Sequence, residues 1–122
     1  MAIIKAVSSR ASIGNSINYI TKKEKTEEKL ISGKDCIPES AIDEMKATKE
    51  LWNKTSGRQY KHFVQSFSPE EKITPEQAHS IALKLAQEEF KGYEVLIATH
   101  KDKKHIHTHF IVNSVSFEDG RK

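Results

Sequence analysis

At 122 residues the chain has room for one compact domain with a modest hydrophobic core, and it is too short for two ordinary domains. Hydrophobic residues make up 36% of it and charged residues 30%, a balance that indicates a folded globular protein rather than a disordered one. No apolar run approaches the roughly 20 residues that span a bilayer, and the first ten residues lack the apolar stretch of a secretion signal. We therefore expect no membrane insertion and a cytoplasmic location.

Charge and cysteine content limit the kinds of partner and site. The net charge of +3 permits a nucleic-acid partner without requiring one. Several basic residues lie close together in the sequence, but solvated surface side chains are the ordinary interpretation of any one such cluster. The single cysteine, Cys36, can form neither an internal disulfide nor a CxxC metal site. Any metal site must therefore use histidines and carboxylates.

The first third of the chain predicts a strand, a short helix and a loop. Residues 2–7 are apolar and rich in β-formers, so they predict an opening strand. Ser12 can cap a helix whose isoleucines recur at helical spacing and which carries Tyr19 near its end. Residues 21–39 are polar and predict a mobile loop.

The remaining two thirds predict two helices and three strands. Helices are expected over residues 40–53 and 74–90, the second with a capping box of Thr74 and Gln77. A strand is expected over 60–67, and 93–100 with 105–116 form a predicted antiparallel hairpin. This order predicts a single α/β (α+β) domain over 1–122, an antiparallel sheet with helices on one face.

Histidines cluster in the predicted hairpin. His105, His107 and His109 alternate along one strand and share a face, which His100 at the end of the preceding strand can also reach. Several imidazoles from adjacent strands predict a divalent metal site with coordination positions left open, and Asp102 is a candidate outer-shell acceptor for one ring. Ordinary surface histidines would explain one or two of these residues but explain four poorly.

At these residues the sequence resembles the mobilization relaxases of the MobA/MobL type, which belong to the HUH endonuclease superfamily. HKDKKHIHTHFIVNSV is similar to the family's three-histidine motif, and SINYITKKEK is similar to its tyrosine motif. The resemblance implies metal ligands at His100, His107 and His109, with His105 at a variable position, and a nucleophile at Tyr19. Family relaxase domains generally extend past a point like FEDGRK, so it also implies that 1–122 is an incomplete nuclease domain.

The implied reaction is nicking of one DNA strand at the origin of transfer of a bacterial plasmid or integrative element. Tyr19 would attack with the help of one Mn²⁺, Mg²⁺ or Zn²⁺ ion, giving a 5′-phosphotyrosine, and accessory transfer proteins are possible partners. Lys22 and Lys23 could stabilise the phenolate, although an amphipathic packing tyrosine is the commoner fate of a helical tyrosine. His105 or Asn113 could act in the second shell of the metal or contact DNA. The expected DNA contacts are Arg10, Lys22, Lys23, Ser66, Lys101, Lys103 and Lys104.

Three other functions are compatible with the same residues. A replication initiator or transposase of the superfamily is disfavoured by three histidines rather than two and by a tyrosine that precedes them. A non-enzymatic accessory protein would bind single-stranded DNA and use a structural metal site closed by His105. A hydrolase acting through metal-bound water lacks an obvious base beyond Asp102.

Overall fold

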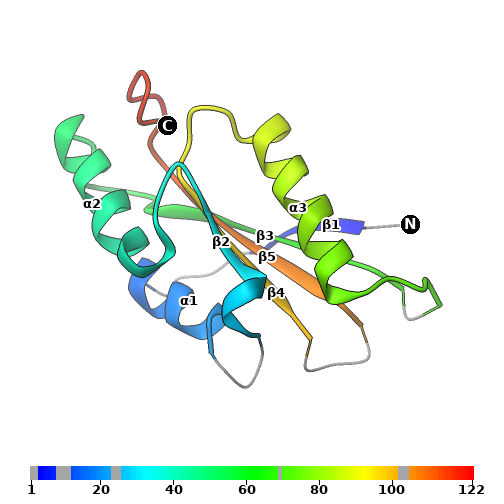
Figure 1. Ribbon diagram of the computed structural model, residues 1–122. Helices are drawn as coiled ribbons and strands as arrows, with labels where there is room; N and C mark the ends of the chain where they lie inside the picture. The colour runs from blue at the N-terminus through cyan, green and yellow to red at the C-terminus, as the bar shows by residue number, and fades with distance from the viewer. Residues whose placement is uncertain (1–2, 8–11, 23–25, 69, 102–104) are drawn as a thin grey trace.

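The computed structural model describes residues 3–7, 12–22, 26–68, 70–101 and 105–122, and these form one sheet with helices packed on it (Figure 1). Within this described part of the chain, four of the five strands and all three α-helices fall where the sequence predicts them, to within a few residues. In chain order the elements are β1 (Ile3–Val7), α1 (Ile13–Ile20), the 3₁₀ turn η1 (Glu28–Leu30), β2 (Ile31–Lys34), the 3₁₀ turn η2 (Pro38–Ser40), α2 (Ala41–Leu51), β3 (Tyr60–Ser66), α3 (Pro75–Glu89), β4 (Val95–His100) and β5 (His107–Asn113).

The five strands form one sheet in the order β1-β3-β5-β4-β2, and every neighbouring pair is antiparallel. This confirms the predicted antiparallel α+β class. The hairpin strands β4 and β5 lie at the centre, with β3 beside β5 and β1 at the edge. Residues opposite one another across a pair share a face, so the register fixes which side chains meet.

Helices cover both faces of the sheet, which corrects the expected one-sided arrangement. On one face, isoleucines of α1 and Met45 of α2 pack against Leu96, Ala98 and Ile111. On the other, Ala82 and Ala86 of α3 belong to a separate core with residues of β4 and β5. Successive residues of a strand point to opposite faces, so alternating apolar residues such as those of the fully buried β4 serve two cores. Figure 1 shows α1 and α2 together on one side and α3 on the other.

The segment 21–39, expected as a mobile loop, contains secondary structure in its described part. Leu30 is buried, and β2 pairs with β4 as the outer strand of the sheet. Thr26 is also buried, and its hydroxyl donates to the backbone oxygen of Thr99 at 2.6 Å. Packing against β4, rather than local propensity, therefore places this segment.

The predicted helix caps are present. Ser12 Oγ accepts a hydrogen bond from the backbone N–H of Asn15 at 3.1 Å, and Thr74 and Gln77 form a reciprocal capping box. Among the residues that the structure describes, no helix is both long enough and apolar enough to cross a membrane.

Candidate metal and DNA site

The register brings the three predicted metal ligands to one face of the sheet. His100 at the end of β4 lies directly opposite His107 at the start of β5, and His109 follows two residues later on the same side. The ring centroids of His100 and His109 are 4.2 Å apart. His105 precedes β5, and its ring centroid lies 6.2 Å from that of His107.

A fourth histidine, His62, joins this face from β3. Its Nε2 lies 2.9 Å from Nδ1 of His109, and the two ring centroids are 5.1 Å apart. Burial lowers the pKa of His62, and the nearby His100 lowers it further. The sequence analysis missed this residue, although its position in an alternating strand was a usable signal once β3 is known to pair with β5.

The carboxyl end of α1 is joined to the same site. Nε2 of His100 donates to the backbone oxygen of Ile20 at 2.8 Å, which in a neutral ring leaves the lone pair on Nδ1. Tyr19 immediately precedes Ile20, and its side chain is 49% exposed. The ammonium of Lys22 lies 5.6 Å from the centroid of the Tyr19 ring. The hydrogen bond therefore fastens the end of the helix that carries the predicted nucleophile to a predicted metal ligand.

The donor chemistry of this face fits a divalent metal ion. His100, His107 and His109 place three imidazoles on two adjacent strands, and such a donor set is typical of open catalytic sites. Within the described residues, however, no three His, Cys, Asp or Glu side chains are arranged as they stand to hold one ion.

The structure describes only some of the residues predicted to contact DNA, and it places them differently. Ser66 lies opposite His107 in the register, on the histidine face. The ammonium of Lys101 is 2.7 Å from Glu27 Oε2, so it is paired with a carboxylate, and this hydrogen bond is the main cause that lowers the pKa of Glu27. The expected positions Arg10, Lys23, Asp102, Lys103 and Lys104 lie outside the described residues.

Lys5 is a basic residue of the histidine face that was not among the DNA contacts expected from the sequence. It lies on the edge strand β1 opposite Val64, which in turn lies opposite His109. The exposed Lys5 therefore shares a row of the sheet with a predicted metal ligand. A cation at this place is suited to a phosphate contact.

Asn113 has a different role from the expected contact with DNA or with a metal ligand. The side chain is fully buried under α2, where Nδ2 donates to Met45 O at 3.1 Å and to Glu94 Oε1 at 2.8 Å. Oδ1 accepts from the ammonium of Lys49 at 2.7 Å. Burial lowers the pKa of Lys49 to about 8. Asn113 thus joins α2 to the strands rather than contacting a histidine.

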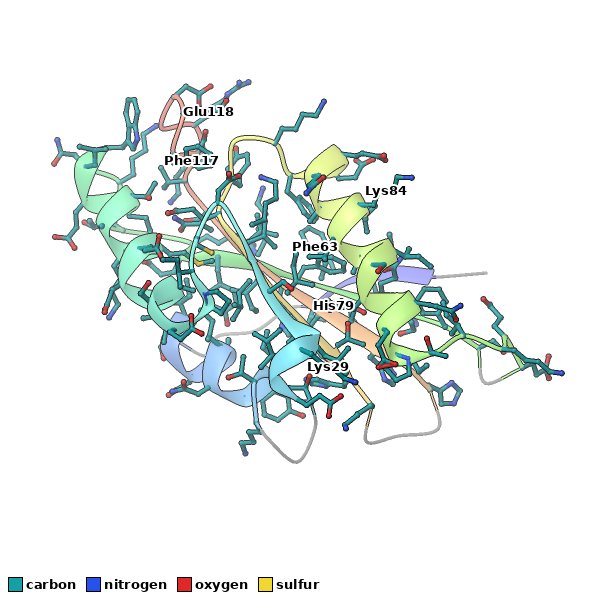
Figure 2. The ribbon with its side chains drawn as sticks, viewed as in Figure 1. Lys29, Phe63, His79, Lys84, Phe117 and Glu118 are labelled. Carbon is teal, nitrogen blue, oxygen red and sulfur yellow. The ribbon has the colours of Figure 1, made fainter. Side chains whose placement is uncertain are left out.

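A second buried polar cluster lies on the opposite face, under α3. His79 Nε2 is 2.8 Å from Ser32 Oγ, and its Nδ1 is 2.8 Å from Thr99 Oγ1, which is 2.9 Å from Thr108 Oγ1. Burial lowers the pKa of His79. Figure 2 shows His79 between α3 and the sheet. Both ring nitrogens have hydroxyl partners, so this histidine is satisfied within the core of the protein.

Comparison with known proteins identifies the family of this chain. Residues 19–122 match the family described as "Relaxase: MobA/VirD2-like, nuclease domain". Protein rlx of Staphylococcus aureus is 38% identical over 116 residues, which are 95% of this chain and 34% of that protein. A second rlx protein of the same species is 40% identical over 111 residues, which are 91% of this chain and 34% of that protein. The group II intron-interrupted relaxase LtrB of Lactococcus lactis subsp. cremoris is 47% identical over 62 residues, 50% of this chain and 11% of that protein. The chain thus spans about a third of the length of its rlx relatives, and it belongs to the MobA/VirD2-like relaxase family, whose nuclease-domain model it matches over residues 19–122.

Proposed function

We propose that this chain is the strand-nicking part of a DNA relaxase and acts on single-stranded DNA at an origin of transfer. Tyr19 is the nucleophile, and His100, His107 and His109 hold one divalent metal ion. The observation that carries the proposal is the hydrogen bond from His100 to Ile20 O, because it joins the helix end bearing Tyr19 to the histidine face. Relaxase nuclease domains generally use a divalent metal.

The chemistry is a transfer of one phosphodiester from a 3′-oxygen to a phenol. The Tyr19 oxygen forms a bond to the scissile phosphorus, and the bond from phosphorus to the 3′-oxygen breaks, leaving a 5′-phosphotyrosine and a 3′-hydroxyl. The proton that the phenol loses balances the one that the departing oxygen gains. When bound, the metal ion supplies positive charge beside a non-bridging phosphate oxygen. Because the phosphodiester bond is conserved in the tyrosine ester, reversal of the same step rejoins the strand.

The residues of the chain position the substrate. Tyr19 is half-exposed, so an extended phosphate backbone can reach its oxygen without opening the core. Lys22 adds a cation beside the phenol ring and Lys5 adds one on the sheet. Both can contact phosphates next to the scissile one, which orients the strand without reading its sequence.

The test is formation of a covalent adduct. Single-stranded oligonucleotides that cover the candidate origin are incubated with the protein and Mn²⁺, and the products are separated on a denaturing gel. We expect a slowly migrating adduct that Tyr19→Phe abolishes, while metal and DNA binding remain. Tyr93→Phe is the matched control because the Tyr93 hydroxyl donates to the backbone oxygen of Arg121 at 3.4 Å, away from the histidines.

Adduct formed equally by Tyr19→Phe would refute the assignment of the nucleophile. Metal binding without any adduct would instead favour the accessory protein with a structural metal site. The placement of His105 beside His107 keeps that second candidate testable, because His105 is the available fourth ligand.

A further inference from the structure

The contact between His62 and His109 is unusual because it joins two imidazoles within hydrogen-bond distance. His62 lies opposite Ile111 in the register, so His109, two residues earlier on β5, is its diagonal neighbour on the same face. The distance of 2.9 Å between His62 Nε2 and His109 Nδ1 is that of a hydrogen bond between ring nitrogens. Two neutral imidazoles can make this bond only if one nitrogen carries the proton and the other accepts it.

We propose that His62 is a positioning residue that accepts the Nδ1–H of His109 and so presents the Nε2 lone pair of His109 to the metal ion. The inference rests on the proposed metal site at His100, His107 and His109. In the opposite arrangement, His62 would donate to Nδ1 of His109 and the His109 proton would sit on Nε2. Neither nitrogen of His109 could then bind a metal, so a site preorganised for the ion holds the first arrangement before the ion arrives.

The same logic applies to His100 with the nitrogens exchanged. Its Nε2 donates to Ile20 O, so the lone pair of the neutral ring is on Nδ1. The two ligands would therefore bind through different nitrogens, Nδ1 of His100 and Nε2 of His109. Metal-binding histidines ordinarily donate their second N–H to a carboxylate, a backbone carbonyl or water, which fixes the tautomer and raises the basicity of the ligating nitrogen. Here a carbonyl serves His100 and an imidazole serves His109.

The first measurement is the affinity for Mn²⁺, read from the electron paramagnetic resonance signal of the free ion. Loss of an outer-shell partner typically weakens metal binding by about 10- to 100-fold, and we expect a loss in this range for His62→Ala. His62→Gln should bind within about threefold of the wild type, because its amide oxygen can accept the same N–H from a similar distance along the side chain. His79→Gln is the matched control, because it makes the same substitution at a buried imidazole on the far face of the sheet.

The second measurement needs neither metal nor activity. In the ¹⁵N-labelled, metal-free protein, long-range proton–nitrogen correlation spectra distinguish the two neutral tautomers of each imidazole. We expect His109 in the Nδ1–H form and His100 in the Nε2–H form, and we expect His109 to lose its preference in His62→Ala. If His62→Ala does not fold, the wild-type tautomers decide the question.

Each remaining outcome separates this inference from the proposed function. A wild type that binds no Mn²⁺ overturns the metal site and the inference with it. If His62→Ala binds Mn²⁺ as tightly as the wild type, the role of His62 is overturned while the proposed metal site stands. Equal losses in His62→Ala and His62→Gln would make His62 a direct ligand, and so would overturn its role as a positioning residue. His109 in the Nε2–H form of the metal-free wild type contradicts the proposed direction of the bond.

Discussion

Replacing Asn113 by alanine should test whether this residue holds the fold together or serves the site. The substitution removes an amide that is fully buried and bonded to Lys49, Glu94 and the backbone oxygen of Met45. Each buried partner left without its hydrogen bond costs about 1–3 kcal/mol, and charged partners cost more. Some relaxation around the small cavity is expected, so we predict a loss of about 3–5 kcal/mol of unfolding free energy.

The assay is urea denaturation followed by the fluorescence of Trp52, the only tryptophan of the chain. A loss of this size is a large part of the roughly 5–15 kcal/mol that stabilises a typical domain, so the midpoint should fall clearly. Asn18→Ala is the control, because Asn18 is exposed on α1 and its replacement should change stability by only about 0.5 kcal/mol. A loss below about 1 kcal/mol for Asn113→Ala, with DNA binding impaired, would refute the structural role and restore the function expected from sequence.

Three further predictions concern acid stability, metal ligation and DNA binding. Burial lowers the pKa of His79 below its ordinary 6.5, so the unfolded chain takes up the proton first as the pH falls. The stability that His79 contributes should be full above pH 6.5 and should decrease as the pH drops below that value. Urea midpoints should therefore fall less between pH 7 and 5 in His79→Gln than in the wild type, and parallel curves would contradict this. His107→Ala should weaken Mn²⁺ binding at least about 100-fold and His105→Ala less than about threefold, measured by free-ion resonance, and equal losses would indicate a closed structural site. Binding of single-stranded DNA, followed by fluorescence anisotropy, should weaken steeply with salt, and Lys5→Ala should reduce the slope of log affinity against log salt by about 0.7; an unchanged slope would exclude Lys5 as a phosphate contact.

The helices and most strands could be predicted because their signals are local. Ser12, Thr74 and Gln77 mark helix starts by side-chain chemistry, and alternating residues mark β3 and β5. The strand β2 has no such signal, since its four residues ISGK alternate poorly and depend on pairing with β4. Its Gly33 is required by the turn that follows, because a Cβ there would lie 2.1 Å from the backbone oxygen of Cys36.

The candidate site shows the same division between local and long-range information. Alternation along β5 was enough to place His107 and His109 on one face, and the hairpin brought His100 to them. The part played by His62 depends on the pairing of β3 with β5, and the position of Asn113 depends on α2 lying over the end of β5. Neither arrangement follows from spacing along the chain, because many strand orders and helix placements accommodate the same sequence pattern.

The hydrogen bond from His100 to Ile20 O gives His100 two roles, as a proposed metal ligand and as an anchor for α1. This affects how mutations of the histidines should be compared. His107→Ala and His109→Ala would each delete a proposed ligand, whereas His100→Ala would delete a ligand and also release the carboxyl end of α1. Its effect on DNA cleavage should therefore exceed its effect on metal affinity, because the nucleophile loses its alignment as well as one ligand of its metal ion.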